Sequence, residues 1–200
     1  YKKIRNLLQR QSRIIENIRR VVYSFKKGDW TFTDLEEALK EQKRQDSLAS
    51  SIQENIFPKK FPSNNIISIT PESFSFGETT GDFFEVIEII PKSLYGIFLA
   101  DIQGHGVSAA LVTIIVKMLF TEATRKFIYP MNLIDYLNKQ MSYIFKQKVF
   151  FTAFYVLIDF NNERFIYSSG GHPYNLKYNA ETENLEKLIT LGPMMGVYDK

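Results

Sequence analysis

Residues 94–120 read LYGIFLADIQGHGVSAALVTIIVKMLF, and this stretch decides the fold class. Its first part, residues 94–100, is a short apolar run with aromatic and branched side chains, which is typical of a buried strand. Asp101 and a glycine-rich turn follow, and apolar side chains spaced three and four residues apart then predict a helix over 107–127. Asp101 is therefore expected where a buried strand meets a tight turn.

The segments on both sides of this stretch complete an α+β pattern. Short β-branched and aromatic runs bounded by proline, glycine or asparagine predict strands, and a second apolar-periodic segment begins after Pro130. The predicted strands are 66–70, 83–90, 94–100, 150–159, 164–168, 176–178 and 185–188, and the predicted helices are 107–127 and 131–145. Strands, then two helices, then strands again favour a layered α+β fold over a βαβ series.

Two further amphipathic helices are predicted ahead of this domain. Residues 1–27 keep an apolar stripe, and the segment 33–36 (TDLE) has the form of a capping box that starts a second helix, which Pro58 ends. The heptad-like seam of the second helix consists of Leu35, Ala38, Gln42, Gln45, Ala49, Ile52 and Ile56. We expect residues 1–57 to form a helical signalling and dimerisation linker and 58–200 to form the globular domain. An ordinary amphipathic hairpin that covers its own domain is the alternative.

Composition limits the chemistry of any site. The chain has no cysteine and two histidines, so thiolate sites are excluded and a metal would be held mainly by carboxylates, which favours Mg²⁺ or Mn²⁺. The net charge of +3 comes from basic residues crowded into the first stretch, which we interpret as a solvated helix face. We find no uninterrupted apolar run near the ~20 residues that span a bilayer.

Two acidic residues stand at strand ends beside glycines. Asp82 follows Gly81, and Asp101 precedes Gly104. Carboxylates on adjacent antiparallel strands can share a metal pair, and two metals can activate water for attack on a phosphoryl group without a side-chain nucleophile. Taken singly, Asp82 as a turn residue and Asp101 as a helix cap are the alternatives. The Gly104–Gly106 segment lacks the spacing of a dinucleotide fingerprint.

Six motifs in order give the chain a family resemblance over about residues 45–197. They are LASSIQENIFP (48–58), GDFF (81–84), DIQGHGVSAAL (101–111) with LN (137–138), FTA (151–153), GHP (171–173) and LGPMMG (191–196). Together they resemble the SpoIIE/RsbU-type bacterial phosphatases, a branch of the type-2C metal-dependent protein phosphatases.

This resemblance implies a type-2C phosphatase-like β-sandwich flanked by helices, with Mn²⁺ or Mg²⁺ between the sheets. It implies hydrolysis of phosphoserine or phosphothreonine on a protein, typically a STAS-type anti-anti-sigma factor in a partner-switching pathway. Asp82 and Asp101 would be metal ligands, with Asp101 bridging two ions and the Ile102 backbone carbonyl as a further ligand. The loop residues expected to support the site are Gly81, Gly104, His105 and Gly106. No side chain is expected to act catalytically, because the nucleophile would be water.

Departures from the family pattern qualify these expectations. Thr80 and Glu85 replace residues that are often Gly and Asp, and His172 in the GHP motif is interpreted as a turn or packing residue. The family's other metal-binding aspartates would lie beyond Lys200, so the domain is expected to be C-terminally incomplete and these 200 residues to be weakly active or inactive. The alternative is a catalytically inactive phosphatase-like module that binds a phosphoprotein.

The resemblance also bears on partners and location. We expect a homodimer through the N-terminal helices, an upstream sensor domain, and a switch role for 33–57 in positioning the metal-binding elements. We expect a cytoplasmic location, or the cytoplasmic part of a membrane-anchored sensor, and no nucleic-acid partner. A basic helical binder of nucleic acid or membrane surfaces is the third hypothesis, and it leaves the Asp101–Gly106 loop unexplained.

Overall fold

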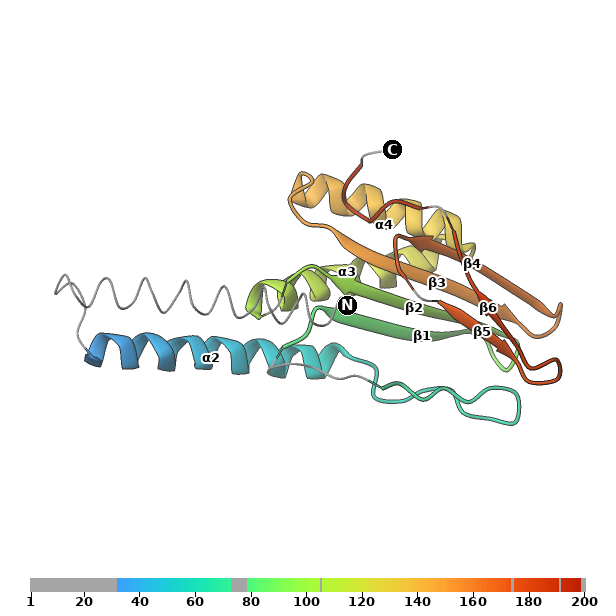
Figure 1. Ribbon diagram of the computed structural model, residues 1–200, viewed down its shortest axis with the longest axis horizontal. Coiled ribbons are helices and arrows are strands. Elements are labelled where there is room, and N and C mark those ends of the chain that lie inside the picture. The colour runs from blue at the N-terminus through green and yellow to red at the C-terminus, as the bar shows by residue number, and fades with distance from the viewer. Residues whose placement is uncertain (1–31, 73–78, 105, 174, 191, 199–200) are drawn as a thin grey trace. The chain divides into compact units, whose positions relative to one another are not determined.

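The computed structural model describes residues 32–72, 79–104, 106–173, 175–190 and 192–198 (Figure 1). The chain divides into two compact units, 1–45 and 46–200. The predicted helix over 1–27 lies outside the described residues. Helix α2 (Phe32–Ile56) runs through the boundary between the units. The predicted division into a linker (1–57) and a globular domain (58–200) differs from this boundary and stays a prediction.

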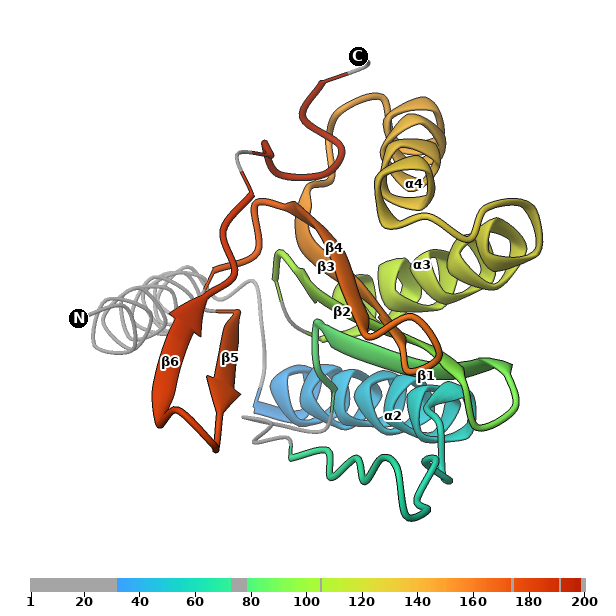
Figure 2. The ribbon, with the colours of Figure 1, turned by 90° about the vertical axis from the view of Figure 1, so that its right-hand side faces the viewer.

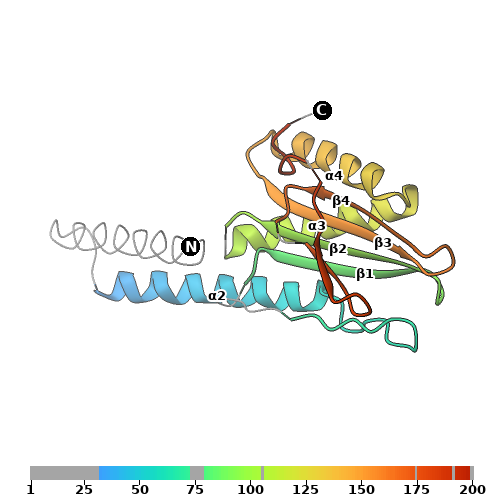
Figure 3. The same ribbon diagram turned by 45° about the vertical axis from the view of Figure 1, so that its right-hand side comes forward.

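An antiparallel sheet of four strands forms the centre of the second unit. Its strands are β1 (Asp82–Ile90), β2 (Leu94–Ile102), β3 (Phe151–Asp159) and β4 (Arg164–Gly170), in the order β1-β2-β3-β4 (Figure 3). Strand β3 returns to the sheet after two helices and pairs along its whole length with β2. The four strands predicted for this sheet therefore exist, with ends displaced by one or two residues, as is usual for boundaries.

Two helices cover one face of this sheet (Figure 2). Helix α3 (Val107–Lys126) and helix α4 (Pro130–Phe145) bury Val116, Phe120 and Leu137 against Phe98 and Tyr155 of the sheet. Within the described part of the chain, α3 is the one helix long and apolar enough to cross a membrane by length and composition, although polar and charged residues interrupt its apolar run. Its buried residues show why it is apolar, because α3 is the core helix of the sheet.

A small hairpin lies on the other side of the sheet. Strands β5 (Leu176–Asn179) and β6 (Asn184–Lys187) pair with each other, and Leu188, directly after β6, packs on Phe154 and Val156 (Figure 2). The helix face and this opposite face thus each have an apolar cluster, and the α+β class is confirmed.

Two details of the prediction are wrong. Residues 66–70 form no strand, because the Asn64 side-chain oxygen accepts hydrogen bonds from the backbone N–H groups of Ile66 and Ile67 and closes a turn, with a single bridge between Ser63 and Ser68. Such side-chain bonds compete with ladder formation.

The start of α2 is the second correction, whereas its seam stays a prediction. Ala49 is buried as expected, but Ile52 is 39% exposed. The buried partner of Ala49 is Gln53, one helical turn further on, which was not assigned to the seam. The helix also begins at Phe32, so Thr33 lies inside the first turn and not at the cap.

Candidate metal centre

The register of β1 and β2 brings the two predicted carboxylates together. Asp82 and Asp101 are direct Cα partners in this antiparallel pair. Directly opposite residues carry their side chains on the same face of a sheet, with Cβ atoms about 5 Å apart. Phe83 and Ala100, the next pair along, are buried against the helices, so the aspartates lie on the opposite face. Both aspartates are exposed to solvent.

Gly81 makes room for the predicted backbone ligand. A Cβ atom added to Gly81 would lie 2.5 Å from the carbonyl oxygen of Ile102, which no side chain allows. The Ile102 N–H in turn donates to the Gly81 carbonyl oxygen at 2.9 Å. The glycine therefore lets the chain beside Asp82 lie directly against the Ile102 carbonyl.

The turn after β2 has a shape that favours glycine. Gly104 and Gly106 have φ angles of 108° and 75°, and Gly106 is the N-cap of α3 without any side-chain cap. Asp101 lies within β2, so the structure rejects its alternative interpretation as the helix cap. His105 lies outside the described residues.

Like charge and reduced solvation act on Asp82. Partial burial by the surrounding protein, and then the neighbouring Asp101 carboxylate, raise the pKa of Asp82 above its ordinary value, although its side chain still reaches solvent. Two carboxylates that repel each other are a suitable site for a divalent cation, because the cation removes the repulsion and replaces lost water.

Gln53 connects helix α2 to the strand that carries Asp82. Its side-chain amide donates to the Thr80 carbonyl oxygen at 2.7 Å and accepts from the Thr80 N–H at 3.1 Å. Gln53 is 3% exposed, so these two bonds satisfy a buried amide. Thr80 in turn accepts, through its hydroxyl oxygen, a bond from the Asp82 N–H. This two-bond contact, which we call the Gln53 clamp, holds the backbone next to the predicted metal ligands.

Glu85 is not part of the carboxylate pair. It lies on the helix-facing side of β1 and forms an ion pair with Lys117 of α3, which also lies over the Phe83 ring. Its departure from the family pattern therefore concerns contact between β1 and α3.

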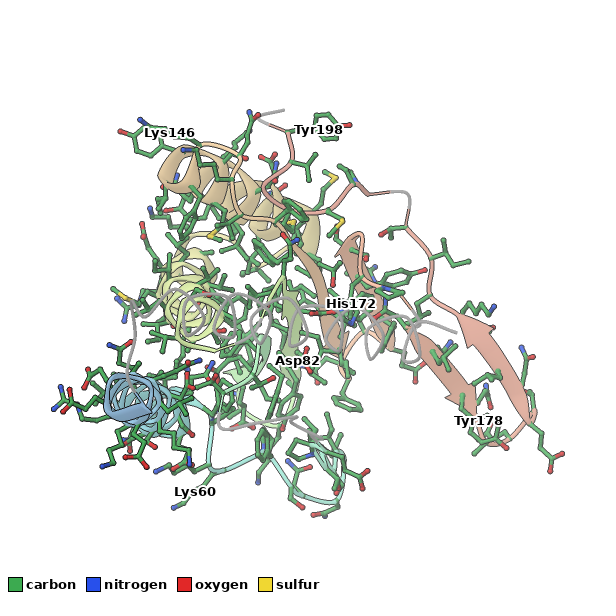
Figure 4. The ribbon with its side chains drawn as sticks, turned by 60° about the vertical axis from the view of Figure 1, so that its left-hand side comes forward. Lys60, Asp82, Lys146, His172, Tyr178 and Tyr198 are labelled. Carbon is green, nitrogen blue, oxygen red and sulfur yellow. The ribbon has the colours of Figure 1, made fainter. Side chains whose placement is uncertain are left out.

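The row of paired residues continues across the sheet to a histidine. Thr152 of β3 is the Cα partner of Asp101, and its Oγ1 forms a 2.8 Å hydrogen bond with Nδ1 of His172. Asp82 and His172 are both labelled in Figure 4. The expectation that His172 is a turn or packing residue did not connect it with Asp101. The motifs FTA and GHP were the available signal, and only the strand register relates them.

In the described ranges, no three Asp, Glu or His side chains come together as a complete metal cluster. The carboxylate pair and the Ile102 carbonyl are all oxygen donors, which suits Mg²⁺ or Mn²⁺. The residues present therefore fit a divalent cation, and their assignment as ligands stays a prediction.

The fold, together with the carboxylate pair on β1 and β2, indicates a class of protein. The chain is similar in structure to the SiaA-PP2C domain of Pseudomonas aeruginosa, with a TM-score of 0.63 and 21% sequence identity over 81% of this chain and 65% of that one. The fold is thus that of type-2C phosphatase domains.

The sequence narrows the class to one family. The family described as Stage II sporulation protein E (SpoIIE) matches residues 91–200, and the chain belongs to this family. It is 24% identical over 157 residues to phosphoserine phosphatase RsbU, and 28% identical over 162 residues to phosphoserine phosphatase RsbP, both of Bacillus subtilis (strain 168). Each match takes in 78% of this chain, which spans 46% of RsbU and 39% of RsbP.

Proposed function

We propose that this chain carries out metal-dependent dephosphorylation of phosphoserine or phosphothreonine on a regulatory protein. The observation that carries the proposal is the direct pairing of Asp82 with Asp101, beside the Ile102 carbonyl against which Gly81 lies. Membership of the SpoIIE family and two relatives named phosphoserine phosphatases support the same reaction.

The residues of the chain have distinct tasks in this reaction. Asp82 and Asp101 would hold Mn²⁺ or Mg²⁺, with the Ile102 carbonyl as a neutral ligand. Divalent cations bound there would lower the pKa of water and neutralise charge on the phosphoryl group. Asp82 must lose its proton to act as a ligand, so its raised pKa makes metal binding compete with protonation.

Two carboxylates supply a charge of −2, which does not balance two dications. We therefore propose that these 200 residues bind metal weakly and turn over slowly by themselves. The alternative hypothesis is a catalytically inactive module that binds the phosphoprotein at the Asp82–Asp101 pair.

Phosphate release from a phosphoserine peptide in the presence of Mn²⁺ tests the proposal. The wild-type chain is expected to release phosphate above the Mn²⁺-only background, and Asp82→Asn and Asp101→Asn are expected to abolish that release. Asp135→Asn is the matched control, because Asp135 pairs with Lys139 on α4, away from the carboxylates. Release that both site variants retain refutes the assignment, and peptide binding without release by the wild type supports the inactive module.

The wider setting is part of the same proposal. A STAS-type protein is proposed as the substrate in a partner-switching pathway, with an upstream sensor and a cytoplasmic location. The cysteine-free composition accords with a reducing compartment.

The Gln53 clamp supports a switch role for the segment 33–57. Because the clamp holds Thr80, a change in the position of α2 would reach the backbone beside Asp82. Gln53→Leu is expected to reduce phosphate release while the chain stays folded, since leucine keeps the bulk but loses both bonds. Unchanged release by Gln53→Leu would exclude this route.

Exposed apolar residues on α2 support the proposed homodimer. Leu48 and Ile52 are 64% and 39% exposed and lie one turn apart. Leu48→Glu is expected to lower the mass measured by light scattering from dimer to monomer. Ser51→Glu, an exposed position on the same helix, controls for the added charge. A wild-type chain that is monomeric at all concentrations would reject the dimer.

A further inference from the structure

The turn that carries His172 is attached to the sheet beside the carboxylate row. Thr152 stands next to Asp101 in the register, and a parallel bridge pairs Ala153 with Gly171. Neighbouring strands lie about 4.8 Å apart, so Thr152 is one strand spacing from Asp101, and its bond to His172 adds one residue to the row.

The turn is held by bonds that do not use the imidazole. The His172 N–H donates to Ser169 Oγ at 3.0 Å, and the His172 carbonyl oxygen accepts from Ser169 Oγ at 3.3 Å and from the Asn175 amide at 3.0 Å. These contacts involve only the backbone of His172. The backbone of His172 is thereby held in place, and the ring's bond to Thr152 adds a contact to β3.

Residues 192–196 pack against the residues that precede His172. Gly170 has no space for a Cβ atom because Met195 fills it, and Gly192 lies directly against the Ser169 carbonyl. Met195 is also bonded in both directions to the backbone of Phe151, next to Thr152. Residues 192–196 thus pack against the segment that carries His172 and are bonded to the start of β3.

We infer that the imidazole of His172, held through Nδ1 by Thr152, contacts the phosphoryl group of the substrate. A phosphoryl group bound at Asp82 and Asp101 presents anionic oxygens, and an imidazole N–H at one or two strand spacings from Asp101 is a donor of suitable reach. Nε2 is the ring atom that meets the phosphoryl oxygen. Thr152 is a positioning residue, because it acts through the ring. The inference rests on the proposed phosphatase function and adds a substrate-binding residue to it.

Nuclear magnetic resonance can test the contact on the chain as it stands. The sequence has only two histidines, so two imidazole signals are expected, and a His105→Gln variant assigns them. In diamagnetic Mg²⁺, inorganic phosphate is expected to shift the His172 signal with the same dissociation constant as the backbone amides of Asp82 and Asp101. Thr152→Val is expected to weaken phosphate binding, and Thr152→Ser, which keeps the hydroxyl, is expected to restore it.

The outcomes separate this inference from the proposed function. Amides at 82 and 101 that respond to Mg²⁺ and phosphate while the His172 signal stays unmoved overturn the contact and leave the metal site standing. If neither the amides of Asp82 and Asp101 nor the His172 signal responds to Mg²⁺ and phosphate, both the metal site and the His172 contact are rejected.

A kinetic arm gives an independent measure. His172→Gln is expected to lower kcat/KM for a phosphoserine peptide by about 10- to 100-fold, the usual effect of losing one hydrogen bond to a charged group. Thr152→Val is expected to cost less, and Thr124→Val on α3 is the matched control because its hydroxyl bonds only within that helix. Equal kcat/KM for His172→Gln and wild type contradicts the inference.

Discussion

Replacing Asp101 by Asn is expected to stabilise the metal-free protein and to remove its response to metal. In the wild type, two carboxylates on paired positions of β1 and β2 repel each other. Asparagine has nearly the same shape and removes one charge. The substitution therefore isolates the electrostatic cost that a metal site imposes on the fold.

The magnitude follows from the pairing. With charge centres about 5.5 Å apart, Coulomb's law gives about 0.8 kcal/mol in a water-like dielectric and about 1.5 kcal/mol in one half as large. Salt at about 0.1 M reduces these values by roughly half. Because both side chains are exposed, we expect a net gain of about 0.5–1 kcal/mol in the free energy of unfolding, which raises Tm by about 1–4 °C.

Added metal is expected to make the wild type more stable than Asp101→Asn, the reverse of their order without metal. At a free Mn²⁺ concentration about 100 times the dissociation constant, a bound ion stabilises the wild type by about 2.7 kcal/mol. Asp101→Asn is expected to lose most of this. Thermal unfolding with and without Mn²⁺ measures both effects, so the two melting curves should exchange places when metal is added.

A matched control checks the sign of the expected change in the free energy of unfolding. Asp135→Asn removes the same charge but breaks an attractive pair with Lys139, so it is expected to lower stability slightly and to keep the metal response. If Asp101→Asn destabilises the metal-free protein, or keeps a full Mn²⁺ response, the reasoning from paired carboxylates is refuted.

Three further predictions concern single sites near the sheet. Gly81→Ala is expected to lower stability by about 1–3 kcal/mol and to lose the Mn²⁺-induced rise in Tm, because its Cβ meets the Ile102 carbonyl; an unchanged metal response would count against that carbonyl as a ligand. Tyr155→Phe is expected to raise the free energy of unfolding in urea by up to about 1 kcal/mol, since the buried hydroxyl has no hydrogen-bond partner among the described residues; a loss above 1 kcal/mol would reveal a partner. The raised pKa of Asp82 means that the folded state binds the proton more tightly than the unfolded state. Its contribution to metal-free stability is therefore present below the ordinary pKa and is lost as the pH rises through the folded pKa, and Asp101→Asn should flatten this part of a stability–pH curve.

The sequence predicted most of the sheet and both core helices because their signals are local. Periodicity in 107–127 and alternation in 83–90 depend on neighbours a few residues away. The segment 66–70 failed because a single side chain, Asn64, redirected two N–H groups, and composition contains no sign of that bond. Gln53 was missed in α2 because the backbone groups that satisfy its buried amide belong to Thr80, 27 residues further along the chain.

The site was predicted in part for a similar reason. Asp82 and Asp101 lie at strand ends beside glycines, so local sequence and family resemblance both pointed to them, and the register confirmed that they converge. His172 could not be related to them, since its place depends on β3 pairing with β2 and on a hydrogen bond to Thr152. Such information is non-local, and one sequence does not contain it in readable form.

The Gln53 clamp has a consequence for the proposed switch role of helix α2. The oxygen and the nitrogen of one side-chain amide bond the N–H and the carbonyl of a single residue, Thr80. Turning the helix by one residue would swing this side chain through about 100° and break both bonds together. If α2 acts as the proposed switch, the backbone beside Asp82 would then respond to two settings of the helix, with both bonds made or both broken.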